Sequence, residues 1–211
     1  MLSRLRGRTV PVRGRTVPGA SGAADDDLPL LRWKLHRWFA CLDTDRDGRL
    51  TSEDYDLAAA RLARAFNHRP GQREHRRLLA RYRKLWALHD PGGRGELDRD
   101  AFTEQLLAAG RDRARPFRAS LNRLCCALVD IADTDGDDQV SEREYRVLLS
   151  AAFGLTSERD LTAAYRMLDR DGSGTLEHNE IHAAVLEYFT SNAPDAPGNW
   201  LLGPPPAALL D

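Results

Sequence analysis

The sequence contains few cysteines and methionines, almost no lysine, and no long apolar run. Its 211 residues include three cysteines and two methionines, and arginine supplies nearly all the positive charge, since the lysines are Lys34 and Lys84. No apolar run approaches the roughly 18 residues that a membrane-spanning helix needs. Cys41, Cys125 and Cys126 are too few for a disulfide framework and are typical of small buried thiols in a reducing compartment. These absences disfavour membrane and disulfide-rich secreted proteins and favour a globular, cytoplasmic one.

The charge is unevenly distributed. The formal net charge is −1, but residues 1–24 hold five arginines and no acid, which leaves 26 basic and 32 acidic side chains beyond them. A near-repeat of Arg-Gly-Arg-Thr-Val-Pro and a run of small residues fill this segment, and neither can bury a core. We therefore predict that residues 1–27 form a disordered leader. Its arginines are interpreted as solvated, with an anionic partner as the alternative.

The most informative stretch covers residues 133–144, Asp-Thr-Asp-Gly-Asp-Asp-Gln-Val-Ser-Glu-Arg-Glu. Oxygen-bearing side chains fall at positions 1, 3, 5, 9 and 12, and the residue at position 7 needs to offer only a backbone carbonyl. Ca²⁺ takes six to eight oxygen ligands in a flexible shell, and this spacing wraps a short loop around one ion. The alternative is an acidic, solvated turn between two helices, which the spacing disfavours.

The same twelve-residue pattern recurs twice, beginning at residues 43 and 169. In each loop, positions 1, 3, 5, 7, 9 and 12 are the candidate ligands of a metal ion. The three sets are Asp43, Asp45, Asp47, Arg49, Thr51 and Asp54; Asp133, Asp135, Asp137, Gln139, Ser141 and Glu144; and Asp169, Asp171, Ser173, Thr175, Glu177 and Glu180.

A fourth loop, beginning at Asp90, keeps the frame without the ligands. Gly95 at position 6 and Leu97 at position 8 survive. Positions 3, 5 and 12 are instead Gly92, Arg94 and Ala101, and an arginine would repel a cation. We predict that this loop is structural and binds no metal.

Each loop is preceded and followed by an apolar stripe with helical spacing. Before Asp43, for example, Leu35, Trp38, Phe39 and Leu42 lie on one face of a helix. Four helix–loop–helix units therefore form an internal repeat over most of the chain. A polar linker over 110–116 separates the second unit from the third. We divide the chain into a first pair over 28–110, a second pair over 111–192, and a proline-rich apolar tail over 193–211 that packs back on the domain, where missing amides disfavour a helix.

These repeated loops resemble those of EF-hand proteins of the sarcoplasmic calcium-binding protein and calerythrin type, over about residues 28–205. The stretch Asp-Ala-Pro-Gly-Asn-Trp-Leu-Leu-Gly over 195–203 is similar to the C-terminal stretch of that family. The resemblance implies an all-α fold in which four EF hands form two pairs within one compact domain, with short two-stranded β contacts between paired loops. It also implies that the first, third and fourth hands bind metal and the second is degenerate, as the residues themselves indicate.

The three candidate sites are expected to differ. Glu144 and Glu180 at position 12 can chelate Ca²⁺ with both oxygens, whereas Asp54 is one methylene shorter. Mg²⁺ prefers six ligands, so the first hand should discriminate least between the two ions. Asp138 occupies position 6 of the third hand, where the others have glycine, and we expect slight strain with binding retained.

Other groups of residues give weaker indications of function. His178 and His182 are four residues apart and are interpreted as a solvated pair rather than a zinc site. The basic run over residues 61–84 is interpreted as the solvated face of a helix, which disfavours nucleic acid as a partner. No nucleophile motif or phosphate-binding loop is present, so we expect no enzymatic activity.

Two functions remain open. One is a cytoplasmic buffer of Ca²⁺, about three ions per chain, with Mg²⁺ chiefly at the hand that begins at Asp43 and with no obligatory partner. The other is a Ca²⁺ sensor that exposes a groove for a target protein. Adaptable grooves tend to be rich in methionine, and Met1 and Met167 are the two in this chain. The composition therefore favours the buffer.

Overall fold

A computed structural model describes residues 28–111 and 115–210. The leader predicted over 1–27 lies outside the described residues. The elements in chain order are α1 (Pro29–Leu42), β1 (Arg49–Thr51), α2 (Ser52–Ala65), α3 (Arg73–His89), β2 (Glu96–Asp98), α4 (Arg99–Arg111), α5 (Arg115–Ala132), β3 (Val140–Ser141), α6 (Glu142–Phe153), α7 (Glu158–Leu168), β4 (Thr175–Leu176), α8 (His178–Thr190) and two short 3₁₀ helices, η1 (Pro197–Trp200) and η2 (Ala207–Leu209).

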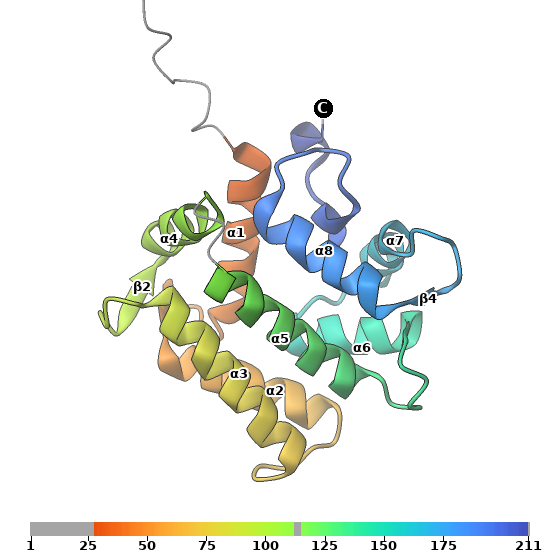
Figure 1. The fold of residues 1–211 in the computed structure, drawn as a ribbon, viewed down its shortest axis with the longest axis horizontal. Helices are drawn as coiled ribbons and strands as arrows, with labels where there is room; N and C mark the ends of the chain where they lie inside the picture. Colours follow the sequence, from red (N-terminus) through yellow and green to blue (C-terminus); the bar gives the residue numbers. More distant parts are fainter. Residues whose placement is uncertain (1–27, 112–114, 211) are drawn as a thin grey trace, which may run out of the picture.

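The helices form four helix–loop–helix units in two pairs, which confirms the predicted fold (Figure 1). In the first pair, β1 and β2 are antiparallel, with Leu50 opposite Leu97. In the second, β3 and β4 are antiparallel, with Val140 opposite Leu176. These four residues occupy position 8 of their loops and are at most 2% exposed. The apolar side chain at position 8 therefore anchors each loop to the core while its strand joins two loops.

Local sequence explains where several helices begin and end. Pro29 begins α1, where its missing N–H costs nothing. Thr51 and Ser141 cap α2 and α6 through capping boxes that involve the acidic residue three positions on. Gly154 ends α6 with a φ of 67°, a left-handed conformation that glycine adopts without strain.

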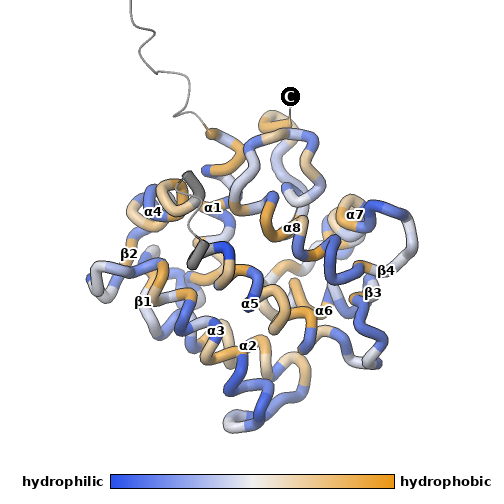
Figure 2. The backbone as a smooth tube through the Cα atoms, viewed as in Figure 1, coloured by the Kyte–Doolittle hydropathy of each residue, from blue (hydrophilic) through white to orange (hydrophobic). Residues whose placement is uncertain are grey.

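One hydrophobic cluster runs through both pairs. Trp38 of α1 packs edge-on against Phe153 of α6 and Phe189 of α8, with ring centroids 5.5 and 5.6 Å apart. Between the pairs, α3 contacts α5, and α2 contacts α6. Hydrophilic and hydrophobic residues alternate along the helices, as expected of amphipathic helices around a shared core (Figure 2). The two pairs are thus one packing unit.

The segment between the pairs is more helical than the sequence suggested. A polar linker was predicted over 110–116, but α4 continues to Arg111 and α5 begins at Arg115. Proline near the start of α5 is compatible with a helix because the first turn has no intrahelical partners for its amides. The predicted linker was therefore too long at both ends.

Apart from half-buried Arg81, the arginine and lysine side chains of α3 are exposed. Lys84 is exposed, and exposed Arg83 pairs with Asp56 of α2, with Nε to Oδ1 at 2.8 Å. On the opposite face Leu78, Tyr82 and Leu85 are buried. On α3 the basic run is therefore the solvent-facing side of an amphipathic helix, whereas Arg61 of α2 is half-buried and donates to the carbonyls of Cys41 and Ala152. Among the described residues, no helix has the length and apolar character to cross a membrane.

Candidate metal centres

The carboxylate at position 1 organises each loop from the end of the entering helix. The N–H of each position-1 residue closes the last helical turn, as in Asp133, which donates to the carbonyl of Val129 at 2.9 Å. The carboxylate then accepts the backbone N–H at position 6. The N–O distances are 3.1 Å for Gly48 to Asp43, 2.8 Å for Gly95 to Asp90, 3.0 Å for Asp138 to Asp133 and 3.0 Å for Gly174 to Asp169.

The backbone at position 6 is left-handed in all four loops. The φ angles are 81° at Gly48, 85° at Gly95, 62° at Asp138 and 84° at Gly174. Aspartate tolerates this region better than most side chains, so the third loop keeps the turn that glycine gives the others. Asp138 thus has a positive φ, the conformation in which slight strain was expected at this position.

The acidic residue at position 12 closes three of the loops from the first turn of the exiting helix. Asp54, Glu144 and Glu180 are 4, 7 and 8% exposed. Each accepts the backbone N–H groups of positions 2 and 9 in its loop. For position 2, the distances are 3.3 Å from Thr44 to Asp54, 2.7 Å from Thr134 to Glu144 and 2.8 Å from Arg170 to Glu180.

Three carboxylates thereby converge in each of the first, third and fourth loops. Within each set, one oxygen from each residue lies within 4.8 Å of the others. The sets are Asp43, Asp45 and Asp54; Asp133, Asp135 and Glu144; and Asp169, Asp171 and Glu180. They correspond to positions 1, 3 and 12 of the predicted ligand sets, and their oxygens are hard ligands suited to Ca²⁺ or Mg²⁺.

The side chains at position 5 form hydrogen bonds with the loop backbone. Asp47 accepts the N–H of Arg49 at 2.8 Å, and Asp137 accepts the N–H of Gln139 at 2.9 Å. Ser173 donates to the carbonyl of Thr175 at 2.9 Å. In each of these loops the side chain at position 5 is therefore hydrogen-bonded to the backbone of position 7.

Position 9 provides the N-cap of each exiting helix. Thr51 and Ser141 occupy it in the first and third loops, and Glu177 occupies it in the fourth. The side chains of Thr51 and Ser141 accept N–H groups from the first turn and so lie beside the acidic residue of position 12.

Burial, hydrogen bonds and neighbouring charges shift the pKa values of these groups. Burial, together with the charges of Asp54 and Asp45, raises the pKa of Asp43. Burial likewise raises the pKa of Asp135, and the nearby carboxylates add to this effect. Burial of Glu144 acts in the same direction, but hydrogen bonds from Thr134 and Ser141 outweigh it and lower the pKa. The clusters are acidic sites whose repulsion a cation would relieve.

The loop at Asp90 lacks such a cluster. Asp90 accepts the N–H groups of Arg94 at 2.9 Å and Gly95 at 2.8 Å, and Asp98 caps the following helix by accepting the N–H of Ala101 at 2.8 Å. Within residues 90–101, all of which the structure describes, no three potential ligands converge. Its two well-placed carboxylates are used to hold the backbone.

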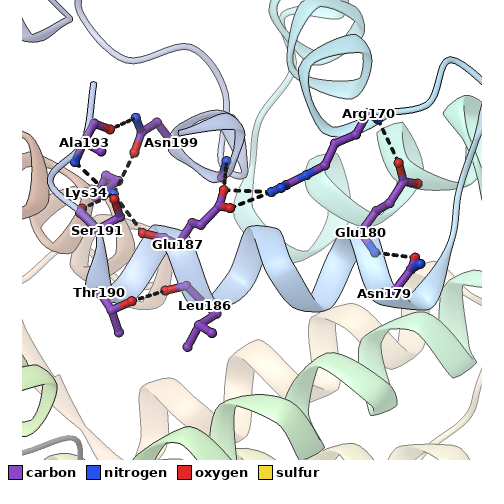
Figure 3. Close-up of polar contacts among 11 residues, drawn as sticks. Lys34, Arg170, Asn179, Glu180, Leu186, Glu187, Thr190, Ser191, Ala193 and Asn199 are labelled. Carbon is purple, nitrogen blue, oxygen red and sulfur yellow. Dashed lines mark hydrogen bonds and ion pairs between the residues drawn. The ribbon is translucent and has the colours of Figure 1, made fainter. Parts of the chain in front are cut away.

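The C-terminal tail is hydrogen-bonded to α1 and packs against α8. Lys34 of α1 is fully buried, and its Nζ donates to the carbonyls of Glu187 and Ser191 and to Oδ1 of Asn199, at 3.1, 2.7 and 2.8 Å (Figure 3). Burial lowers the pKa of Lys34 to about 8, which leaves the amine charged at pH 7. Its three N–H donors thus match three acceptors, one of them on the tail.

The fourth loop is linked to the same tail. Arg170, at position 2, pairs through its guanidinium with both carboxylate oxygens of Glu187 at 2.8 Å (Figure 3). Oε2 of Glu187 also accepts the N–H of Gly198 at 2.8 Å. A Cβ added to Gly198 would lie 2.5 Å from the carbonyl of Ala184, so the tail approaches α8 too closely for a larger residue.

One group was missed by sequence reasoning. The two histidines were interpreted as a solvated pair, but only His178 is exposed, whereas His182 is half-buried and Cys126 of α5 lies against both. Its Sγ is 3.4 Å from Nε2 of His178 and 3.8 Å from Nε2 of His182. The residues are 52 and 56 positions apart, so no short spacing in the sequence could have revealed the contact.

Comparisons with known proteins agree with this geometry. The family model described as EF hand matches residues 35–56, which span the first loop. No curated protein matches the chain by sequence. The fold matches that of a Streptomyces coelicolor calcium-binding protein described in prokaryotic calcium-mediated regulation, at 26% identity and a TM-score of 0.65, over 76% of this chain and 98% of that one.

Two photoproteins share the fold at lower identity. Calcium-loaded apo-aequorin from Aequorea victoria is 18% identical, with a TM-score of 0.62, over 76% of this chain and 91% of its own. Magnesium-loaded apo-berovin, a ctenophore photoprotein whose three Ca²⁺-binding loops all bind Mg²⁺, is 20% identical, with a TM-score of 0.59, over 74% and 86%. The matched hand and the four-unit fold are those of EF-hand calcium-binding proteins, in agreement with the resemblance to the sarcoplasmic calcium-binding protein and calerythrin type.

Proposed function

We propose that this EF-hand protein is a cytoplasmic calcium buffer whose first, third and fourth hands each bind one ion. The observation that carries the proposal is the convergence of three carboxylates in each of those loops and not in the loop at Asp90. Each hand except the one at Asp90 has a buried acidic residue at position 12, and this residue accepts hydrogen bonds from two backbone amides. Position 12 supplies the bidentate ligand in an EF-hand loop.

The proposed sites differ in their preference between Ca²⁺ and Mg²⁺. The distance from the position-2 N–H to the position-12 carboxylate is 3.3 Å at Asp54, against 2.7 Å at Glu144 and 2.8 Å at Glu180. The shorter aspartate therefore reaches less far across its loop. Mg²⁺ needs a compact octahedral shell and Ca²⁺ accepts seven ligands, so we infer that the first hand admits Mg²⁺ most readily.

The burial of the apolar side chains supports storage of Ca²⁺ rather than signalling. Trp38 and the tail residues Leu201 and Leu202 help to line an apolar cavity of about 70 Å³ inside the second pair. Leu202 is 2% exposed, so the protein's own C-terminal segment covers this region. Among the described residues, the large apolar side chains that are exposed, Leu57, Val147 and Met167, lie on three different helices. We therefore propose a buffer without an obligatory partner.

The alternative function is a sensor. The Streptomyces coelicolor protein with the same fold is described in calcium-mediated regulation, and this chain shares 26% identity with it. As a sensor, the chain would release its tail on binding Ca²⁺ and expose the apolar lining to a target protein.

Fluorescence of an apolar dye during Ca²⁺ titration distinguishes the two functions. The full chain is first stripped with a chelator, its folding is checked by circular dichroism, and Ca²⁺ is then added with and without Mg²⁺. A buffer is expected to show little change or a fall in dye fluorescence while ions bind. A large rise on adding Ca²⁺ to a folded apo form would establish the sensor, and failure to bind Ca²⁺ would exclude both.

The variant Asn199→Ala serves as the control for the tail. It removes the acceptor that Lys34 uses on the tail and should raise dye fluorescence whether or not Ca²⁺ is present. If the dye responds to this variant but not to Ca²⁺ in the wild type, then the assay detects an open tail and the ion does not open it.

A further inference from the structure

A second kind of metal-binding geometry lies beside the fourth hand. Cys126 of α5 and His178 and His182 of α8 bring one sulfur and two imidazole nitrogens within 4.8 Å of one another. The two S–N distances are 3.4 and 3.8 Å, both to Nε2. A tetrahedral zinc ion with Zn–S of about 2.3 Å and Zn–N of about 2.0–2.1 Å separates sulfur from nitrogen by about 3.6 Å. The observed distances lie on either side of that value.

The surrounding structure holds these groups in place. Cys126 and the two histidines are on helices that pack against each other, and His178 and His182 are one helical turn apart, with ring centroids at 5.1 Å. The backbone of Asn122, one turn before Cys126, lies beside the His182 ring. A backbone carbonyl beside the ring is a usual support of a ligating histidine, because it can accept the ring N–H that does not bind the metal.

A hydrogen-bonded thiol accounts for the cluster less completely. A neutral thiol has one proton, so it can donate to one Nε2 at a time, and sulfur is a weak hydrogen-bonding atom. A single cation would engage the sulfur and both nitrogens together. Thiolate and imidazole ligands select zinc-like ions, whereas Ca²⁺ and Mg²⁺ prefer the oxygens of the neighbouring loops.

We propose that Cys126, His178 and His182 form a binding site for Zn²⁺ or a similarly soft divalent ion, separate from the calcium loops. The three protein ligands leave a fourth tetrahedral position for water or an added ligand. His178 lies between Glu177 and Glu180, which hold positions 9 and 12 of the fourth loop. A metal bridging it to α5 would fix the exiting helix of that hand, and its binding would be linked to that of Ca²⁺ there.

The test titrates Zn²⁺ into the full, reduced chain with Ca²⁺ in saturating excess, by competition with a chromophoric zinc chelator. One Zn²⁺ per chain is expected. Cys126→Ser and His182→Ala should each weaken the affinity by more than about 100-fold, because loss of an outer-shell partner alone costs about 10–100-fold. Circular dichroism checks that each variant is folded.

Matched controls separate this site from other thiols, other histidines and the calcium loops. Cys125→Ala removes the adjacent, buried thiol, and His75→Ala removes a histidine on α3. Both should bind Zn²⁺ like the wild type. Glu180→Gln, which disables the fourth loop, should also retain the Zn²⁺ site, so failure of the proposed calcium function and failure of this proposal are distinguishable.

Co²⁺ reports the ligands directly. Co²⁺ added to the Ca²⁺-saturated wild type should show thiolate-to-metal charge-transfer absorption and intense tetrahedral visible bands, and Cys126→Ser should abolish the charge-transfer band. The proposal is overturned if Zn²⁺ does not bind, if it binds equally to wild type and Cys126→Ser, or if Glu180→Gln alone removes it.

Discussion

The loops that begin at Asp43 and Asp90 are partners in one β contact, yet they differ in chemistry. Both place a position-1 carboxylate on the position-6 amide, and both bury a leucine at position 8. Only the first of the two gathers three carboxylates, whereas the second has Ala101 at position 12. The comparison teaches that the frame of a hand and its ligands are separable. Backbone hydrogen bonds and apolar anchors build the frame, and the acidic residues at positions 3 and 12 complete the carboxylate cluster in the first loop.

The strongest test of this separation removes one ligand from an otherwise intact loop. Glu144→Gln takes away the buried carboxylate at position 12 of the third hand and is expected to weaken Ca²⁺ binding there by about two orders of magnitude or more. Isothermal titration calorimetry should show one site fewer. Arg94→Ala, in the loop at Asp90, is the control and should leave the stoichiometry unchanged. A gain of a site in that control would show that Arg94 alone blocked the second hand.

The converse change adds ligands to the frame that lacks them. The combination Gly92→Asp, Arg94→Asp and Ala101→Glu should create a further, weaker Ca²⁺ site, in the 10⁻⁴–10⁻³ M class of Kd. A Cβ at Gly92 would meet Arg94 Cγ at 4.0 Å, which is ordinary contact, so the side chain has room. Calorimetry against the parent chain measures the added site. If the triple variant folds and gains none, the frame at Asp90 is not equivalent to the others.

A smaller effect is expected from lengthening the position-12 ligand of the first hand. Asp54→Glu should raise the preference for Ca²⁺ over Mg²⁺ by about tenfold, equivalent to about 1.4 kcal/mol, because the longer carboxylate can chelate with both oxygens. Competitive titration of Ca²⁺ in the presence of Mg²⁺ provides the measurement. Glu180→Asp, in the fourth hand, is the reciprocal variant and should lower the same preference. If both variants keep the selectivity of the wild type between Ca²⁺ and Mg²⁺, the argument from side-chain length is wrong.

The smallest effect concerns the backbone of the third loop. Asp138 has a φ of 62°, where glycine lacks the steric penalty of a side chain. Asp138→Gly is expected to change the free energy of unfolding by about 1 kcal/mol or less, because glycine also gains entropy in the unfolded chain. Chemical denaturation in saturating Ca²⁺ measures it. A loss of several kcal/mol would mean that the Asp138 side chain has a role beyond its backbone conformation.

The sequence predicts the repeated part of this molecule well because the repeat is local. Loop spacing and helical stripes located the four units, and the pairing of position-8 residues follows from the fold. The linker was misjudged because a proline in the first turn of α5 looks the same in sequence as one in a loop. Long-range contacts were beyond prediction, such as Lys34 with Asn199 and Cys126 with the two histidines. They depend on how helices far apart in sequence pack together.

Calcium stoichiometry of the full chain, measured by isothermal titration calorimetry after metal is removed with a chelator, tests the central claim most directly. Three ions per chain are predicted, with the loop at Asp90 contributing none. Two or fewer ions, or an ion whose binding is lost on changing Asp90 and retained on changing Glu144, would contradict it.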